Sequence, residues 1–323
     1  MINLEEVTKI YPGTTEPAVD KVSLKIEKGN ICVFVGPSGC GKSTILRMIN
    51  HLVEPTSGNI YIEGKRAIEY DINELRRNIG YVIQQVGLLP HKTIYDNVAL
   101  VPRLQKWSEG DIKNKVYELM EMIGLNPEEV NHKYPYQLSG GQMQRVGVAR
   151  AMAANPEIML MDEPFGAVDP IIRSKLQDEF LKLQQELKKT ICFVTHDIEE
   201  AIKMGDYIVI LNEGQVVQVG NPMEVLSAPA NDFVKDLLGE DRGVKILDLT
   251  KSEQLMITDL SMLEDAKKND AYIDGIKPVK AALEVMMSRD SDVVAVLRKN
   301  EVVGLLKWQH VKAHVSDVSG GDE

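Results

Sequence analysis

The segment GPSGCGKST at Gly36–Thr44 decides the fold of this chain. It follows the apolar run ICVFV and fits the phosphate-loop pattern G-x-x-x-x-G-K-S, in which backbone N–H groups and a helix N-terminus face a phosphate. We expect Lys42 to reach the β- and γ-phosphates of ATP and Ser43 to hold Mg²⁺. The candidate nucleotide-binding residues here are Gly36, Pro37, Ser38, Gly39, Cys40, Gly41, Lys42, Ser43 and Thr44. The competing interpretation is an ordinary glycine-rich turn before a helix.

A second segment, IMLMDEP at Ile158–Pro164, ends an apolar strand in two carboxylates. Ligands of open α/β folds bind at the carboxyl ends of the strands, so these side chains are expected near the phosphate loop. We expect Asp162 to complete the Mg²⁺ shell, through water, and Glu163 to orient or deprotonate the attacking water. Taken alone, the pair would indicate no more than an exposed turn before a proline.

The segment LSGGQ at Leu138–Gln142 precedes an amphipathic helix. Its hydroxyl and backbone N–H groups form a second anion site at a helix N-terminus. A helix cap alone would also explain the serine, and the two interpretations are compatible. The candidate residues are Ser139, Gly140, Gly141 and Gln142.

The remaining pattern predicts an α/β core. Short alternating segments at the N-terminus predict strands, and ICVFV predicts a strand buried on both faces of a parallel sheet. Apolar residues at helical spacing predict a helix over 111–123. After LSGGQ we expect helix 142–153, strand 158–161, helix 172–187, strand 191–195 and helix 198–203, and then a hairpin turning at 212–214.

Composition restricts the function classes. The 323 residues carry a net charge of −11, which argues against a nucleic-acid surface. We find neither an apolar run of transmembrane length nor a signal peptide, and the three cysteines suggest neither disulfides nor a metal site. We therefore expect a cytosolic protein whose cysteines are reduced. If a membrane is involved, a partner subunit must supply the part that spans it.

Together these motifs strongly resemble the nucleotide-binding subunit of ATP-binding cassette (ABC) transporters, over roughly Met1–Gly239. The resemblance implies a P-loop NTPase with a RecA-like core, an antiparallel β subdomain and a helical subdomain. It implies that two copies close around ATP, each supplying half of each site. The further roles that it implies are adenine stacking by Tyr11, sensing of Mg²⁺ and water by Gln84, a link between the two sites at Asp169 and a γ-phosphate contact by His196.

Taken singly, these residues have structural explanations as well. Tyr11 could be a core aromatic residue, Gln84 a polar strand end and His196 a helix cap. Cys40 lies in the phosphate loop near a helix N-terminus, which favours its thiolate. We interpret it as a small filler residue whose alkylation would block ATP binding.

Three longer stretches resemble the ATPases that drive uptake of glycine betaine, choline and carnitine. They are YPGTTEPAVDKVSLKIEKG, GYVIQQVGLLPHKTIYDNV and DEPFGAVDPIIR. The resemblance implies a peripheral subunit on the cytoplasmic face of the membrane. It would contact the integral membrane permease near Gly87–His91 and an extracytoplasmic substrate-binding protein only indirectly. Otherwise Leu88, Leu89 and Pro90 would form an unexplained exposed patch.

A separate unit is expected after Gly239, giving an ATPase domain at 1–239 and a small α+β domain at 244–315. Residues 276–315 resemble one cystathionine-β-synthase (CBS) module, whereas 244–275 resemble a first module only weakly. Such modules have a Thr or Ser and an Asp where this chain reads GLLKWQH, so a dimerisation or docking role competes with ligand-dependent regulation. We expect an apolar sheet face to pair with a second copy, through Val293, Val294, Val296, Val302, Val303 and Leu305.

Other functions remain open at this point. Exporter subunits and importers of another solute, such as an amino acid or a different betaine, share these motifs. LSGGQ ATPases that act on DNA or ribosomes are a further class. The former carry a long coiled coil and the latter two cassettes in one chain, and neither pattern is seen here.

Overall fold

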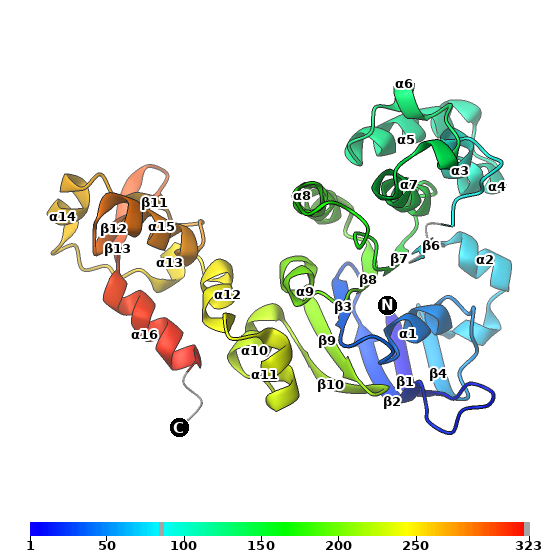
Figure 1. Cartoon of the computed structure of the whole chain (residues 1–323), viewed down its shortest axis with the longest axis horizontal. Helices are drawn as coiled ribbons and strands as arrows, with labels where there is room; N and C mark the ends of the chain where they lie inside the picture. The colour runs from blue at the N-terminus through cyan, green and yellow to red at the C-terminus, as the bar shows by residue number, and fades with distance from the viewer. Residues whose placement is uncertain (84–86, 320–323) are drawn as a thin grey trace. The chain divides into compact units, whose positions relative to one another are not determined.

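The computed structural model describes residues 1–83 and 87–319 (Figure 1). It divides into two compact units, Met1–Pro222 and Met223–Glu323. This division lies before the predicted boundary at 239–244, because α10 (Pro222–Ser227) and α11 (Asp232–Leu238) group with the C-terminal unit. The functional boundary at 239–244 stays a prediction.

The N-terminal unit is built on two sheets. The six-stranded sheet has the order β10-β9-β3-β8-β7-β6, and its five strands from β9 to β6 run parallel. Its strands are β3 (Ile31–Val35), β6 (Ile79–Val82), β7 (Ile158–Asp162), β8 (Thr190–Val194), β9 (Tyr207–Asn212) and β10 (Gln215–Gly220). The second sheet is antiparallel and has the order β2-β1-β4-β5, from β1 (Ile2–Lys9), β2 (Val19–Ile26), β4 (Ser57–Ile62) and β5 (Lys65–Arg66). The predicted α/β core is thus confirmed.

The three central strands β3, β7 and β8 are buried at every residue. Such strands are apolar throughout because helices or a second sheet cover both faces of a parallel sheet. The carboxyl ends of these three strands therefore lie side by side, which places the segments that follow Val35, Asp162 and Val194 at one edge.

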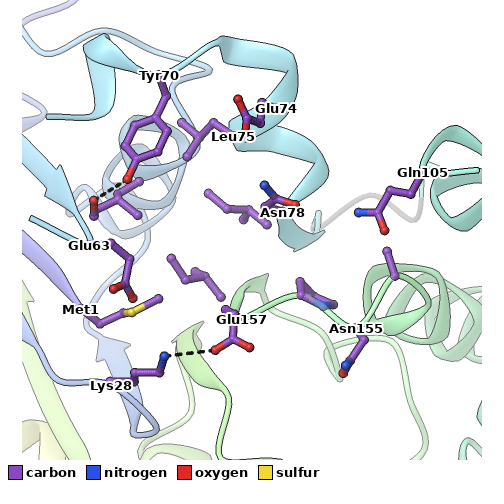
Figure 2. Close-up of a pocket in the computed structure, with 15 residues that line it drawn as sticks. Met1, Lys28, Glu63, Tyr70, Glu74, Leu75, Asn78, Gln105, Asn155 and Glu157 are labelled. Carbon is purple, nitrogen blue, oxygen red and sulfur yellow. Dashed lines mark hydrogen bonds and ion pairs between the residues drawn. The ribbon is translucent and has the colours of Figure 1, made fainter. Parts of the chain in front are cut away.

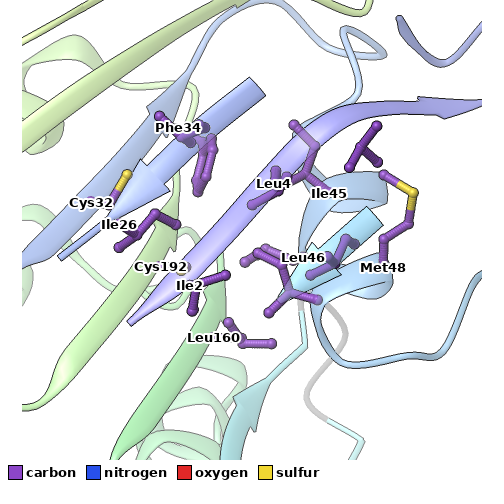
Figure 3. Packing of buried hydrophobic residues seen from close by; sticks show 14 of the residues in the cluster. Ile2, Leu4, Ile26, Cys32, Phe34, Ile45, Leu46, Met48, Leu160 and Cys192 are labelled. Carbon is purple, nitrogen blue, oxygen red and sulfur yellow. The ribbon is translucent and has the colours of Figure 1, made fainter. Parts of the chain in front are cut away.

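Helix α1 (Lys42–Ile49) packs between the two sheets (Figure 3). Its Ile45, Leu46 and Met48 lie in one apolar cluster with Leu4 of β1 and Leu160 of β7. Burying each such side chain contributes about 1.5–3 kcal/mol. The phosphate loop is consequently fixed at both ends, by β3 before it and by α1 after it.

Helices gather beside the sheet as a helical subdomain (Figure 1, cyan to green). They are α3 (Ile94–Val98), α4 (Leu100–Leu104), α5 (Glu109–Met122), α6 (Pro127–Val130) and α7 (Gly140–Met152), with a short 3₁₀ turn η2 (Pro135–Gln137). Helix α2 (Ile72–Arg77) packs against β6 instead, and the 3₁₀ turn η1 (Ala67–Glu69) packs against β4. The predicted helix over 111–123 is α5, which buries Ile112, Val116, Leu119 and Met120 as the spacing required. Ser108 caps its N-terminus by accepting a hydrogen bond from the Asp111 N–H.

The rest of the unit follows the predicted order. Helices α8 (Pro170–Leu187) and α9 (Ile198–Met204) alternate with β8, and β9 and β10 form a hairpin. Glu213 and Gly214 have φ of 48° and 78°, as the two central residues of a type I′ turn require.

The C-terminal unit also contains α12 (Arg242–Leu249), α13 (Ser252–Leu255), α14 (Leu263–Lys268), α15 (Val279–Arg289) and α16 (Trp308–Ser319). Its sheet consists of β11 (Tyr272–Asp274), β12 (Val293–Arg298) and β13 (Glu301–Lys307). β11 and β12 are parallel and joined through α15, and β13 is antiparallel to β12. No helix in the described ranges is long and apolar enough to cross a membrane.

The expected pairing of this sheet through an apolar face is wrong. Val294 and Val296 are buried against α12, α15 and α16, while Val293 and Leu305 are buried on the other side with Ala266 of α14. Both faces are therefore covered within the unit itself. The valines fit the pattern of a sheet with one exposed face that a second copy would cover. The helices of the same unit cover that face instead.

Candidate functional site

The phosphate loop connects β3 to α1 and needs glycine at two positions. A Cβ on Gly36 would lie 2.1 Å from the Leu211 carbonyl oxygen, and one on Gly41 would lie 2.3 Å from that of Ala18. Both residues also have positive φ, of 153° and 104°. These backbone approaches press the loop against neighbouring segments and leave Pro37, Ser38 and Gly39 exposed at its tip.

Lys42 lies inside the curve of this loop. Its Nζ donates to the carbonyl oxygens of Gly36 at 2.6 Å and Pro37 at 2.8 Å, and the residue is only 6% exposed. The buried thiol of Cys40 lies 3.7 Å from the same nitrogen. The loop therefore surrounds the side-chain nitrogen of Lys42, and the buried Cys40 fills the space next to it.

The two carboxylates at the carboxyl end of β7 have different environments. Asp162 is 2% exposed and accepts a hydrogen bond of 2.9 Å from Ser43 Oγ. Burial raises the pKa of the Asp162 carboxyl, although the bond from Ser43 acts in the opposite direction. This contact joins two of the three predicted Mg²⁺-site residues across 119 residues of sequence, and the third is Gln84.

Glu163 begins the loop after β7 in the left-handed conformation, with φ of 49°. Its N–H donates to the Val194 carbonyl at 3.0 Å, which ties it to the end of β8. Its Oε1 lies 3.1 Å from Nδ1 of His196, which follows β8. The predicted base and the predicted γ-phosphate contact thus face each other.

Thr195, which directly follows β8, is fixed by a buried carboxylate that sequence reasoning missed. Glu200 of α9 is 7% exposed and accepts hydrogen bonds from Thr195 Oγ1 at 2.7 Å and from Gln177 Nε2 at 3.1 Å. Burial raises the pKa of the Glu200 carboxyl. A charged residue at a buried position of α9 was the only sequence signal for it.

Tyr11 lies beside the phosphate loop. Its hydroxyl is 3.4 Å from Thr44 Oγ1, and the side chain is half-buried. The ring is therefore not part of the apolar core, and it stands next to the end of the loop.

The predicted cap at LSGGQ is confirmed. Ser139 Oγ accepts from the Gln142 N–H at 3.2 Å, and Gln142 Oε1 accepts from the Ser139 N–H at 3.0 Å, which forms a capping box on α7. A Cβ on Gly140 would meet nothing within 4 Å, whereas one on Gly141 would lie 3.3 Å from the Ala167 carbonyl oxygen. The two glycines thus differ in surroundings, one facing open space and the other the loop after β7.

Gln144, on the next turn of α7, is a site residue that sequence reasoning missed. Its Nε2 donates to the Glu163 carbonyl at 2.7 Å, and its Oε1 accepts from the Ala167 N–H at 2.8 Å. It is 4% exposed and lies on the buried stripe of the helix with Val148 and Ala151. A polar residue within an apolar helical stripe was the available signal.

Two further residues are predicted for the site, Asp169 and Gln84. Asp169 is exposed and caps α8, accepting from the Ile171 N–H at 3.0 Å. Gln84 lies outside the described residues. The chain is described again from Gly87, whose carbonyl accepts from Arg150 Nη1 at 2.7 Å.

A cavity of about 380 Å³ lies away from these residues (Figure 2). Met1, Tyr70, Asn78 and Glu157 are among the residues that line it. It also contacts Ile158, the first residue of β7, whereas the predicted Mg²⁺ ligand Asp162 is the last. The cavity is therefore at the opposite end of the strand from the candidate site.

Comparisons with known proteins agree with this geometry. A family model for the ABC transporter matches residues 19–166. The glycine betaine/carnitine/choline transport ATP-binding protein OpuCA of Bacillus subtilis is 47% identical over 304 residues, covering 94% of this chain and 77% of that protein. The glycine betaine uptake system ATP-binding protein YehX of Escherichia coli is 41% identical over 311 residues, covering 96% and 98%.

A solved structure matches the fold of the ATPase part. It is a dimeric post-hydrolysis state of the ATP-binding cassette MJ0796 bound to ADP and Pi, with a TM-score of 0.64 and 38% identity. The match covers 69% of this chain and 99% of that one. Given the ordered set of motifs, their convergence at one sheet edge and 47% identity over most of the chain, this protein belongs to the ATP-binding proteins of ABC transporters.

Proposed function

We propose that this chain is the ATP-binding subunit of an importer for quaternary ammonium osmolytes such as glycine betaine, carnitine and choline. The observation that carries its ATPase chemistry is the convergence of Lys42, the Ser43–Asp162 pair and the Glu163–His196 pair at one edge of the sheet. The substrate class rests on the relatives, whose names specify glycine betaine, carnitine and choline.

ATP fits the phosphate loop through its β- and γ-phosphates. On binding, Lys42 would exchange its bonds to the Gly36 and Pro37 carbonyls for phosphate oxygens. The loop N–H groups and the N-terminus of α1 would complete the cradle. Tyr11, next to Thr44, is in position to stack on the adenine.

The oxygen donors present fit Mg²⁺. Ser43 Oγ and Asp162 Oδ1 lie 2.9 Å apart, and no group of three or more potential metal-ligating side chains occurs in the described part of the chain. Mg²⁺ typically takes one or two protein oxygens and completes its shell with phosphates and water. When bound, it would neutralise charge on the β- and γ-phosphates. Gln84 is proposed as a further member of this site.

Glu163 acts on the attacking water in this proposal. The water oxygen forms a bond to the γ-phosphorus, the bond from that phosphorus to the bridging oxygen breaks, and Glu163 accepts the water proton. His196 contacts the γ-phosphate through Nε2, because Nδ1 faces Glu163. ADP leaves with the bridging oxygen.

A second copy of the chain completes each site. The exposed Ser139 and Gly140 at the N-terminus of α7 would contact the ATP held by the other copy, with Gly141, Gln142 and Asp169 at the same interface. The matched MJ0796 structure is dimeric, which supports this arrangement. No nucleic-acid partner is proposed.

The segment Gly87–His91 is the proposed contact with the integral membrane permease. Asn97, which is fully buried, holds it by accepting from the Leu89 N–H at 2.7 Å and donating to the Leu89 carbonyl at 3.1 Å. This side-chain amide gives an irregular segment a fixed shape, as a docking surface requires. The subunit would lie on the cytoplasmic face of the membrane and reach the extracytoplasmic binding protein only through the permease.

For the tail, we propose one CBS-like module over 244–315 whose first half is degenerate. The order β11-α15-β12-β13-α16, with a parallel pair followed by an antiparallel pair, supports the comparison. In the sequence, helices α12–α14 occupy the segment in which a first module would lie. Its role is regulation or dimerisation of the transporter.

Transport in a bacterial strain that lacks quaternary-amine uptake tests this proposal. The chain is supplied with its cognate permease and binding protein, and uptake of labelled glycine betaine, carnitine and choline is compared with uptake of an amino acid. We expect uptake of one or more of the amines, and loss of it in Glu163→Gln. Uptake of the amino acid alone would instead favour another importer. ATPase activity without any uptake would favour a non-transport ATPase.

A further inference from the structure

The buried side chain of Gln144 joins the LSGGQ helix to the loop that carries Glu163. The two ends of one amide contact the first and the fifth residue of the segment Glu163–Ala167. We propose that Gln144 is a positioning residue for ATP hydrolysis, which sets the direction of the Glu163 carboxylate by holding the backbone of that residue. The inference rests on the proposed function of Glu163.

Glu163 needs such support because its conformation is unfavourable. Its φ of 49° lies in the left-handed region, which residues with a side chain rarely adopt. Its N–H is held by Val194 at 3.0 Å, and its carbonyl accepts from Gln144 at 2.7 Å and from Gly166 at 3.2 Å. The Gly166 bond stays within the loop, so Gln144 alone among these donors ties the carbonyl to another element.

The loop and the helix N-terminus also touch directly. The Ala167 carbonyl oxygen would lie 3.3 Å from a Cβ on Gly141, so only glycine leaves this approach relaxed. With the Gln144 amide one turn further along, the start of α7 and the loop from Glu163 to Ala167 form one body. A displacement of α7 is therefore transmitted to Glu163.

This connection has a consequence for the proposed dimer. The N-terminus of α7 would bind the ATP held by the second copy, whereas Glu163 serves the ATP of its own chain. When α7 moves onto the ATP of the second copy, Gln144 would pass that movement to Glu163, which acts on the ATP of its own chain. It touches neither nucleotide, so it acts through Glu163 and Ala167 only.

The chain offers a matched control in Gln184, near the end of α8. Its amide clamps backbone in the same way, with Oε1 accepting from the Lys189 N–H at 3.0 Å and Nε2 donating to the Gly29 carbonyl at 3.0 Å. Lys189 precedes the first residue of β8, so this clamp lies at the opposite edge of the sheet from Glu163. A purely structural role would give the two residues similar mutant phenotypes.

The test compares Gln144→Leu with Gln184→Leu in the full-length protein. In each variant leucine removes every hydrogen bond of the side-chain amide at similar volume. Because small misplacements of a catalytic group are costly, we expect kcat of Gln144→Leu to fall about 10- to 100-fold. The KM for ATP and the equilibrium affinity for a fluorescent ATP analogue should stay at the wild-type value. Gln184→Leu should lose thermal stability but keep kcat per folded molecule.

A second variant, Gln144→Glu, supplies a pH readout and covers the case in which the leucine variant does not fold. The introduced carboxyl still accepts from the Ala167 N–H, but it can donate to the Glu163 carbonyl only when protonated. The ratio of its kcat to that of wild type should therefore rise as the pH falls from about 8 to about 6.

Two results would overturn the inference: a wild-type kcat in Gln144→Leu, or a ratio for Gln144→Glu that does not change with pH. If wild type itself hydrolyses no ATP, it is the proposed function that fails. An active wild type with an equally active Gln144→Leu removes only the positioning role.

Discussion

Nδ1 of His196 lies 3.1 Å from Oε1 of Glu163, although 33 residues separate them in sequence. Each residue follows the carboxyl end of a buried parallel strand, β8 or β7, and the two strands are neighbours. The sheet register therefore creates the pair. One imidazole nitrogen faces the carboxylate, which leaves Nε2 available for the proposed contact with the γ-phosphate.

His196→Ala removes the contact with Glu163 and the proposed contact with the γ-phosphate. Loss of one donor to a developing charge typically lowers kcat about 100- to 1,000-fold, and we expect a decrease of this order here. ATP affinity should change little because Lys42 and the loop remain. Steady-state ATPase assays and equilibrium nucleotide binding measure the two quantities. A kcat equal to wild type would exclude His196 from the reaction.

Asp162→Asn should stabilise the nucleotide-free protein. Burial raises the pKa of the Asp162 carboxyl, so the folded state takes up its proton at a higher pH than the unfolded state does. An ionised Asp162 therefore lowers stability at neutral pH, and this cost disappears as the pH falls through the folded-state pKa toward 3.8, the ordinary value.

Thermal unfolding of both proteins across this pH range measures the effect. The midpoint of Asp162→Asn should exceed that of wild type at neutral pH, and the difference should shrink on acidification. MgATP should stabilise wild type but not the variant. A wild-type response of the variant to MgATP would contradict the assignment of Asp162.

An added charge at LSGGQ should prevent ATP-dependent dimerisation. In the proposed dimer, Gly141→Asp would place a carboxylate against the γ-phosphate held by the other copy, but its Cβ also crowds the Ala167 carbonyl of its own chain. Gly140→Asp has no such neighbour within 4 Å and is the cleaner test. We expect both variants to bind ATP as monomers and to fail to dimerise in light scattering, while Gly140→Ala dimerises. Dimerisation of Gly140→Asp at the wild-type level would argue against a shared site.

Deletion from Val244 onward should spare basal ATP hydrolysis and change the response of transport to ionic strength. The residues proposed for ATP binding and hydrolysis all precede Met204. The three-stranded sheet of the tail has its own apolar clusters on both faces. Transport by the reconstituted complex, with and without the tail, is measured across a salt series. Identical curves would remove the regulatory role, and a loss of dimer stability alone would favour docking.

Local rules predicted most of the N-terminal unit. Strand β3 is apolar at every position, α5 repeats buried residues at helical spacing, and the hairpin of β9 and β10 turns within the predicted segment 212–214. The phosphate loop and the two carboxylates at the carboxyl end of β7 could be placed because parallel strands align their carboxyl ends.

Contacts between side chains and distant backbone could not be predicted in this way. Gln144 acts on the Glu163 carbonyl 19 residues away, and no spacing rule specifies such a bond. The valines of β12 and β13 fit a half-exposed sheet equally well until α14 is placed over the second face. In both cases the deciding partner is set by tertiary packing.

In the proposed mechanism, two copies of this chain enclose ATP and Glu163 starts its hydrolysis. The most direct measurement is the mass of Glu163→Gln by light scattering, with MgATP and with MgADP, together with the nucleotide bound per chain. We predict a stable dimer with one ATP per chain in MgATP, a monomer in MgADP and almost no turnover. A monomer in MgATP, or a Glu163→Gln variant that keeps most of the wild-type ATPase activity, would contradict the account.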